Sequence, residues 1–319
     1  MQAHCDICGN TEGNRLHTAR EMMVGLRTPF QYLECAACGC LQNITVPADL
    51  GRYYADGYYS MTEARQHEPA WRRWLKARRT RAHLGATGWP DRALLKRFGA
   101  PGIPRWTRRA GVKQHHRVLE IGCGSGDLLL AMQAEGYTHL SGADPFIAAD
   151  IDHGGGLHIR KTAVDALHGQ WDAVVLEHAF EHIPAPHATL QHLGTLLAPG
   201  GALIISLPLK AEAWNLYGVD WVQLDAPRHL YLHTEHSFRL LAAGWNVADV
   251  EFDSGPVQFW GSEQYQADIP LLDERSHRRN PQASRYTPQD IAVFQQRADV
   301  LNAQGRGDQA TFILRRPRF

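Results

Sequence analysis

The sequence lacks a surplus of charge of either sign, because its 319 residues carry 33 basic and 33 acidic side chains. A protein that depends on phosphate contacts normally has a basic surplus, so the composition disfavours nucleic acid as a partner. No apolar run approaches the ~20 residues that a bilayer-spanning helix needs, and we expect no membrane partner. The first residues, MQAHCDICGN, lack the basic and apolar segments of a signal peptide. We therefore expect a cytoplasmic protein whose six cysteines serve as ligands or core residues rather than in disulfides.

Composition divides the chain into three zones. Residues 1–60 hold five of the six cysteines and are predicted to form a small zinc-ribbon-like module. Residues 61–110 are rich in Arg, Lys and Trp and are predicted to be a helical linker. Residues 111–319 form the main domain, with insertions expected at 208–234 and 254–307.

Short apolar runs alternate with helical patterns from residue 116 onward. The expected strands are 117–121, 139–143, 157–160, 172–176, 202–207, 247–252 and 310–314. Strands that alternate with helices indicate a mainly parallel sheet covered by helices on both faces. The sequence therefore predicts an α/β fold with a doubly wound, Rossmann-like sheet of seven strands, and a small zinc ribbon before it.

A glycine-rich loop follows the first of these strands in the segment VLEIGCGSGD, residues 118–127. Gly122, Gly124 and Gly126 let the backbone turn tightly and approach a cofactor closely. Glu120 precedes them, and an acid there would repel a pyrophosphate but attract a free ammonium group. Asp144 ends the next strand, where a carboxylate can accept hydrogen bonds from ribose hydroxyls. The spacing G-x-G-x-G and the acid favour an amino-acid-bearing cofactor over NAD.

These residues resemble the class I S-adenosylmethionine-dependent methyltransferases, closely over residues 117–207. The resemblance implies that the chain binds S-adenosyl-L-methionine. It implies contacts to the methionine part from Glu120, Gly122, Gly124 and Gly126, and to the ribose from Asp144. It further implies that Asp165 faces the adenine amino group, with a simple loop-capping role as the alternative. Leu176 and Glu177 would close the pocket at the end of the fourth strand.

The fourth strand opens into EHAFEHIP, residues 177–184, at the edge of the sheet where ligands bind. Methyl transfer requires an acceptor held at attack distance and the removal of its proton. His182 is the preferred general base, because a pKa near 6.5 suits that role, and His178 and Glu181 are further catalytic candidates. A structural histidine bonded to a loop carbonyl is the alternative.

A divalent metal is a further alternative at this segment. The O-methyltransferases of ubiquinone biosynthesis are similar here and carry E-x-x-E-H, a metal-holding pattern. This chain has Glu181 and His182 but places His178 where the first Glu would stand, and such a change can weaken or re-select a metal. Whether a metal sits at these three residues stays open.

A second polar segment, DWVQLDAPRHLYLHT, spans residues 220–234. It resembles a D-x-P-R-H-L segment of methyltransferases that modify sugars and polysaccharide or natural-product precursors. The resemblance implies that Arg228 and His229 shape the acceptor pocket, with His229 as a second candidate base. The alternative is a buried loop in which Arg228 and an aspartate form a structural ion pair.

Two C-x-x-C knuckles near the N-terminus predict a structural zinc site with the ligands Cys5, Cys8, Cys35 and Cys38. Sugar C-methyltransferases are similar in their order of cysteine ribbon, Tyr-rich linker and methyltransferase core. In that comparison Tyr58 or Tyr59 would cover the acceptor, and plain interdomain packing is the alternative.

The sequence therefore predicts an enzyme that methylates a small-molecule acceptor, a sugar or natural-product intermediate, with a histidine base. One alternative is an RNA methyltransferase that grips nucleic acid with its ribbon and the Arg-rich stretch 65–81, which we interpret instead as a solvated helical face. Another is a non-catalytic zinc-binding scaffold. The acceptor, the methylated atom type and the oligomeric state stay open.

Overall fold

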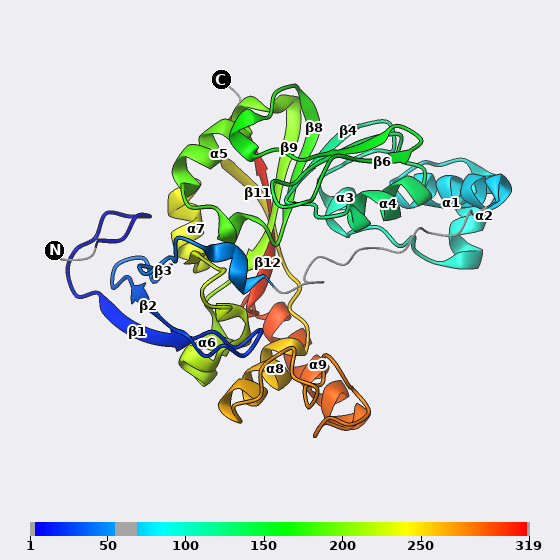
Figure 1. Ribbon diagram of the computed structural model, residues 1–319. Coiled ribbons are helices and arrows are strands. Elements are labelled where there is room, and N and C mark those ends of the chain that lie inside the picture. Colours follow the sequence, from blue (N-terminus) through cyan, green and yellow to red (C-terminus); the bar gives the residue numbers. More distant parts are fainter. Residues whose placement is uncertain (1–3, 55–68, 318–319) are drawn as a thin grey trace.

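The computed structural model describes residues 4–54 and 69–317, which contain two β-sheets and the helices around them (Figure 1). The large sheet has the strand order β11-β12-β9-β8-β4-β5-β7-β6. Its strands are β4 (Arg117–Ile121), β5 (His139–Ala143), β6 (Ile151–Gly154), β7 (Leu157–Arg160), β8 (Trp171–Glu177), β9 (Leu197–Pro208), β11 (Asn246–Phe252) and β12 (Gln309–Arg315). The doubly wound α/β fold is thereby confirmed.

The centre of the large sheet is parallel and its edges are antiparallel. Strand β4 lies between β5 and β8 in parallel register, and β7 and β9 extend the parallel part on either side. Strand β12 pairs antiparallel with both β9 and β11. The predicted number of seven strands is wrong by one, because β6 adds an antiparallel edge next to β7. This strand is only four residues long and half of it is exposed, so it lacks a clear apolar pattern.

Helices cover both faces of the large sheet (Figure 1). The α-helices of the described residues are α1 (Ala70–His83), α2 (Trp89–Phe98), α3 (Trp106–Arg109), α4 (Asp127–Ala134), α5 (Pro186–Thr195), α6 (Glu212–Tyr217), α7 (Glu235–Leu241), α8 (Val257–Gln266) and α9 (Pro288–Ala303), and α3, α4, α5 and α7 pack on the sheet. Alternate residues of each strand face opposite sides, so Val118 packs with α3 and α4 while Leu119 packs with α5 and α7. Among the described residues, no helix is both long and apolar enough to cross a membrane.

The small sheet joins the N-terminal segment to the main domain. It has the order β1 (Arg15–Arg20), β2 (Pro29–Glu34), β3 (Leu41–Asn43) and β10 (Tyr231–Leu232), all antiparallel. The last strand comes from the segment after β9, almost 200 residues further along the chain. Cys5 and Cys35 share a buried core with Phe238 of α7 and Leu190 of α5. The cysteine segment therefore packs as part of the larger body, and the predicted boundary at residue 60 falls among residues 55–68, outside the described part.

Helices α8 and α9 lie in the insertion expected at residues 254–307. Seven of the ten residues of α8 are buried, so this helix shows no amphipathic period. Helix α2 begins at Trp89 with Pro90 in its first turn, where proline is tolerated. Helix α9 begins with a capping box, in which the Thr287 side chain accepts the Asp290 N–H and Asp290 accepts the Thr287 N–H.

Candidate functional site

A cavity of about 250 Å³ opens at the carboxyl ends of β4, β5 and β8. Its lining combines apolar side chains with residues singled out in the sequence. They are Tyr54, Ile121, Gly122, Asp144, Pro145, Phe146, Ala163, Val164, His178, Ala179, His182, Ile183 and Pro184. Ligands of open α/β sheets bind at this edge, and a mostly apolar pocket with a few converging polar groups is the usual form of such a site.

The glycine loop forms one wall of this cavity. Its backbone has positive φ angles, which residues with side chains rarely adopt. Gly122 and Gly126 have φ angles of 74° and 88°. A Cβ atom on Gly122 would lie 2.5 Å from the Ala179 Cβ, so the loop and the β8 end approach too closely for any side chain. The Gly124 N–H donates to Asp144 Oδ2 at 2.9 Å, and the Phe146 N–H donates to Oδ1 at 2.8 Å. The buried Asp144 is thus fixed at the cavity wall.

Glu120 lies behind the loop as a buried acid with an unsatisfied oxygen. Its side chain is 5% exposed, and Oε2 has no hydrogen-bond partner. Burial and the neighbouring carboxylates of Glu177, Asp127 and Asp144 raise the pKa of Glu120 well above its usual range. An acid in such a place is stabilised by a cationic group, which restores its charged form.

The remaining cofactor candidates lie in different surroundings. Asp165 is exposed on a short 3-10 helix, Val164–Ala166, whose first residue lines the cavity. Leu176 is fully buried in the core below the cavity, so at this strand end Ala179 lines the cavity. Glu177 is the last residue of β8, and partial removal of its carboxyl group from water by the surrounding protein raises its pKa.

Three histidines surround the carboxylate of Glu181, whose side chain is 0% exposed. Glu181 Oε1 lies 3.7 Å from His178 Nδ1 and 3.8 Å from His229 Nε2, and the rings of His182 and His229 are 4.8 Å apart. His178 leaves β8 with φ = 51°, an unusual angle for a residue with a side chain. The structure thus brings all four catalytic candidates together, from two segments more than 40 residues apart.

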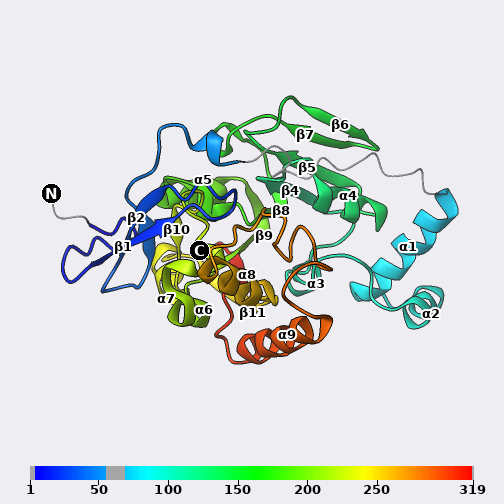
Figure 2. The same ribbon diagram turned by 60° about the horizontal axis from the view of Figure 1, so that its bottom comes forward.

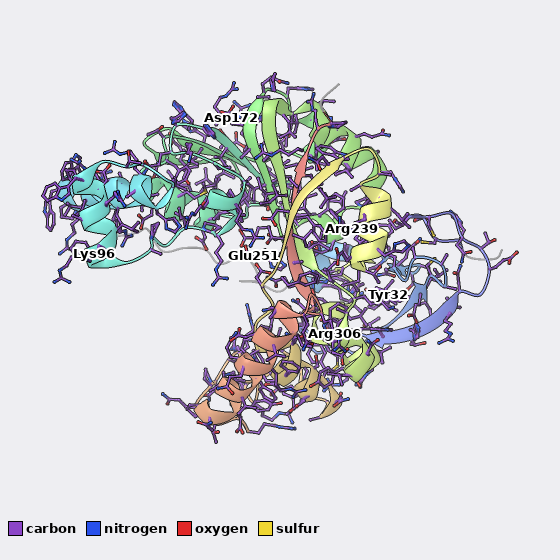
Figure 3. All side chains as sticks on the ribbon, turned by 180° about the vertical axis from the view of Figure 1, so that it is seen from behind. Tyr32, Lys96, Asp172, Arg239, Glu251 and Arg306 are labelled. Carbon is purple, nitrogen blue, oxygen red and sulfur yellow. The ribbon has the colours of Figure 1, made fainter. Side chains whose placement is uncertain are left out.

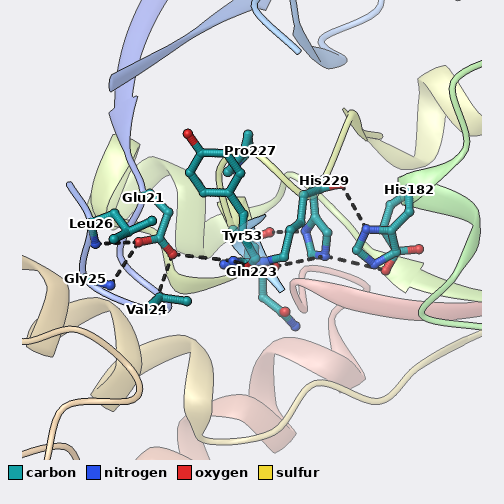
Figure 4. Close-up of polar contacts among 12 residues, drawn as sticks. Glu21, Val24, Gly25, Leu26, Tyr53, His182, Gln223, Pro227 and His229 are labelled. Atoms are coloured by element: carbon teal, nitrogen blue, oxygen red, sulfur yellow. Dashed lines mark hydrogen bonds and ion pairs between the residues drawn. The ribbon is translucent and has the colours of Figure 1, made fainter. Parts of the chain in front are cut away.

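Backbone carbonyls orient the rings of His182 and His229 (Figure 4). His182 Nδ1 lies 2.9 Å from the Arg228 carbonyl oxygen, and His229 Nδ1 lies 2.7 Å from the Gln223 carbonyl oxygen. A carbonyl oxygen only accepts, so each Nδ1 carries the proton and donates it. In the neutral ring the Nε2 atoms are then acceptors, and that of His229 faces Glu181.

Residues of this cluster have pKa values shifted in different directions, so their charges near neutral pH differ. Burial of Glu181 acts to raise its carboxyl pKa, but the close contact with His178 and the charges of His182 and His229 outweigh burial and bring the pKa to about 2. Burial and the nearby His182 lower the pKa of His229 to about 4, against the raising effect of Asp225. Burial also acts to lower the pKa of His178, yet its contact with Glu181 raises it overall. Glu181 is therefore an anion and His229 a neutral ring near pH 7.

Arg228 lies behind the cluster, fully buried, in an ion-pair network. Its Nε donates to Asp225 Oδ2 at 2.8 Å, its Nη1 lies 3.4 Å from Glu21 Oε1, and it also donates to the Tyr53 carbonyl oxygen. Glu21 in turn accepts three backbone N–H groups, from Val24, Gly25 and Leu26 (Figure 4). Arg228 is thus a structural ion-pair partner, the alternative considered from the sequence, and it is absent from the cavity lining.

An aromatic residue of the N-terminal segment covers the cavity. Tyr54 stacks on Phe146 with ring centroids 5.8 Å apart, and its ring lies 6.4 Å from that of His182. Tyr58 and Tyr59, the residues proposed for this position, lie outside the described residues. The role of Tyr58 or Tyr59 stays a prediction, and neither Tyr54 nor Phe146, two residues after Asp144, was assigned to this cavity from the sequence.

The four predicted zinc ligands converge at the N-terminal segment. Their sulfur atoms all lie within 4.8 Å of one another, and none forms a disulfide. The Cys5 and Cys38 sulfurs are 3.7 Å apart, and those of Cys8 and Cys35 are 3.5 Å apart. Tetrahedral zinc with Zn–S bonds of about 2.3 Å requires sulfur separations of about 3.8 Å, so the geometry fits that ion. Cys40 is buried outside this group.

Comparison with known proteins gives a family match over the part of the chain that holds the cavity. A model of the methyltransferase domain matches residues 92–251. The chain is 30% identical over 168 residues to a ubiquinone biosynthesis O-methyltransferase of Bordetella avium, covering 47% of this chain and 70% of that protein. A protein of the same name from Methylocella silvestris is 30% identical over 183 residues, covering 52% of this chain and 70% of that protein.

Other matches are shorter or more distant. The chain spans about half the length of the similarly named protein of Pectobacterium atrosepticum, at 31% identity over 125 residues. A crystal structure described as an S-adenosylmethionine-dependent methyltransferase from Mesorhizobium loti aligns with a TM-score of 0.39 and 16% identity, over 63% of this chain and 91% of that one. Since the family model covers half of the sequence and the glycine loop and Asp144 meet at one cavity, the chain belongs to the methyltransferase domain family and is an S-adenosylmethionine-dependent methyltransferase.

Proposed function

We propose that this enzyme methylates a small-molecule acceptor, a sugar or natural-product intermediate, with His182 as the general base. The observation that carries the proposal is that one cavity is lined by residues of both functions. Gly122 and Asp144 lie on its cofactor side, and His182 lies on the opposite side. The cavity of about 250 Å³ is mostly lined by apolar side chains with a few polar groups, the usual form of a small-molecule site. A screen of sugar nucleotides and other metabolites with methyl-labelled cofactor tests it, and the absence of transfer to every small molecule would contradict it.

The residues on the cofactor side fit S-adenosylmethionine. Its sulfonium supplies the methyl group when it is bound. Asp144 would hold the ribose hydroxyls, and the loop from Gly122 to Gly126 would let the methionine part lie against the backbone. Glu120, with its unsatisfied Oε2, would face the ammonium group. Asp165 would hold the adenine amino group from the edge of the cavity.

The proposed base is prepared by its neighbours. The Arg228 carbonyl oxygen fixes the Nδ1–H tautomer of His182, so Nε2 can accept the proton of the acceptor. The imidazolium that forms is stabilised by the anionic Glu181, whose pKa of about 2 keeps it charged. His229 stays neutral at its pKa of about 4 and therefore adds no opposing charge. The apolar residues around the cavity exclude water from the transfer.

A divalent metal is a second candidate for the role of this cluster. Donor atoms of Glu181, His182 and His229 lie within 4.8 Å of one another, and one carboxylate with two imidazoles suits a transition metal. Such an ion would act as a Lewis acid on an acceptor hydroxyl. Metal analysis after treatment with a chelator separates the two roles: activity that persists when only the cysteine-bound metal remains supports the base, and activity restored by added Mn²⁺ supports the metal.

Cofactor binding by this site is expected to depend on the protonation of Glu120. The raised pKa of Glu120 favours its protonated form, whereas an ammonium group beside it would favour the charged form and release the proton. Affinity for S-adenosylmethionine should therefore strengthen as pH rises through that pKa, and binding should release protons. Glu120→Gln should bind about tenfold more weakly or worse, without that proton release. Calorimetry in buffers of different ionisation enthalpy measures both the affinity and the number of protons released. Subtracting the proton release of Glu120→Gln removes the contribution of the cofactor's own amino group. Equal proton release in both proteins would contradict this role.

We propose a structural zinc ion at Cys5, Cys8, Cys35 and Cys38. Four thiolates complete a tetrahedral site and leave no open position, so this ion would have no catalytic part. Metal analysis of freshly purified, reduced protein should give about one zinc per chain. Cys35→Ser should lose the ion and destabilise the small sheet, whereas Cys40→Ser, outside the cluster, should keep it. A zinc content near zero in the unmodified protein would rule out this site.

A further inference from the structure

The hairpin of helices α1 and α2, residues 70–98, has a large excess of positive charge, although the whole chain has no net charge. It contains nine Lys and Arg residues against one acid, Asp91, which leaves 24 basic and 32 acidic residues in the rest of the chain. Asp91 is buried between Arg78 and Arg81, and Arg79 pairs with Glu135 of the main domain. The positive charge is therefore gathered on one protruding element.

The same hairpin exposes large aromatic side chains. Trp71 and Trp74 of α1 are 59% and 56% exposed, and Trp89 and Phe98, at the two ends of α2, are 81% and 57% exposed. Such residues normally lie in a core or an interface, and a group of them on one element marks an interaction surface. Trp71 and Trp74 are three positions apart, so they lie on the same side of α1.

The hairpin stands at one end of the molecule, away from the small sheet. Figures 1 and 2 show α1 and α2 beyond the edge of the large sheet, with the N-terminal segment at the opposite end in both views. In Figure 3, Lys96 of α2 lies at the far end from Tyr32 of β2. A flat surface can therefore contact the hairpin without meeting the cysteine segment.

We propose that this hairpin docks the enzyme on an anionic phospholipid surface. Helices of low hydrophobicity that combine Lys and Arg with Trp and Phe lie in the headgroup region of a bilayer, and anionic headgroups attract the basic side chains. This contact needs no spanning helix, so the lack of a long apolar run does not bear on it. The proposal therefore departs from the sequence-based expectation of no membrane partner.

Lipid fits this surface better than RNA does. Bases bind by stacking on open aromatic faces. Here the guanidinium groups of Arg72, Arg78 and Arg97 lie over the rings of Trp71, Trp74 and Phe98 at 5.3, 4.8 and 5.4 Å from the ring centroids. Each of these rings thus has one face occupied by a cation of the protein itself, while the exposed edges remain able to enter a headgroup layer.

Vesicle sedimentation of the full-length protein tests the proposal. We expect binding to phosphatidylcholine vesicles containing about one third phosphatidylglycerol, weaker binding at high salt, and little binding to pure phosphatidylcholine. Arg72→Ser/Arg73→Ser should weaken the binding by about tenfold or more. Trp89→Ser/Phe98→Ser should weaken it although the charge is unchanged. Methyl-transfer activity in solution should be unaffected in both variants.

Matched substitutions elsewhere serve as controls. Arg278 and Arg279 are adjacent and exposed in the loop before α9, and Val300 is exposed on α9. Arg278→Ser/Arg279→Ser and Val300→Ser should bind vesicles as the unmodified protein does. Equal loss in the control variants, or no binding to the anionic vesicles, would overturn the proposal. Binding to a single-stranded oligouridylate with no binding to vesicles would assign the hairpin to nucleic acid instead.

Discussion

His182→Ala is expected to lower the turnover number by about 10²–10⁴-fold while leaving the affinity for S-adenosylmethionine unchanged. The loss follows from the position of the ring, which lines the cavity and is held by the Arg228 carbonyl oxygen so that Nε2 is available to the acceptor. Glu181→Gln should reproduce part of the loss, because the neutral amide cannot stabilise the imidazolium. Single-turnover rates with labelled cofactor measure the chemical step directly.

The affinity for S-adenosylmethionine separates a loss of catalysis from structural damage, because a damaged site would also bind the cofactor more weakly. His236→Ala, at an exposed position of α7, is a suitable control because that side chain lies outside the cavity lining. Unchanged turnover in His182→Ala would remove this residue from the mechanism and leave His229 as the candidate base.

Arg228→Met should lower the free energy of unfolding by about 3–5 kcal/mol. The guanidinium group is fully buried and contacts the carboxylates of Asp225 and Glu21, so its removal leaves two buried acids without their cation. Arg239→Met is the matched control, because that arginine pairs with Glu235 on an exposed helix face, where an ion pair contributes about 1 kcal/mol or less. Denaturant unfolding measures both changes.

A second substitution tests the cause of this loss. Asp225→Asn in the Arg228→Met background removes one of the unpaired charges, so the double variant should be more stable than Arg228→Met alone. If Arg228→Met lowers the free energy of unfolding by less than about 1 kcal/mol, the buried ion-pair network does not stabilise the fold in this way.

The sequence was most informative where local pattern and function coincide. The strand-glycine-helix segment at 117–135 and the acid at Asp144 follow from short-range geometry, and the structure brings them to one cavity. The capped start of α9 could be predicted because Thr287, Pro288 and Asp290 act within one turn. The paired knuckles predicted the cysteine group for the same reason, since each C-x-x-C is a local turn.

Features that depend on distant contacts could not be predicted. Tyr54 lines the cavity because the N-terminal segment packs on the loop after β5, where its ring stacks on Phe146. The cluster of His229 with Glu181 joins one segment that precedes β9 in the sequence and one that follows it. Helix α8 is buried on most sides, so its hydrophobic pattern carries no period. Strand β6 is too short and too exposed for an apolar pattern to reveal it.

Strand β10 lies almost 200 residues after β3 in the sequence, and this separation affects the order in which the small sheet can fold. During synthesis the first three strands of the small sheet leave the ribosome long before Tyr231 and Leu232, which complete its edge. Until those residues arrive, β3 presents an unpaired edge, and pairing over so long a sequence separation is slow. A fragment that stops before residue 231 is therefore expected to aggregate more readily than the full chain, even when its cysteines are loaded with metal.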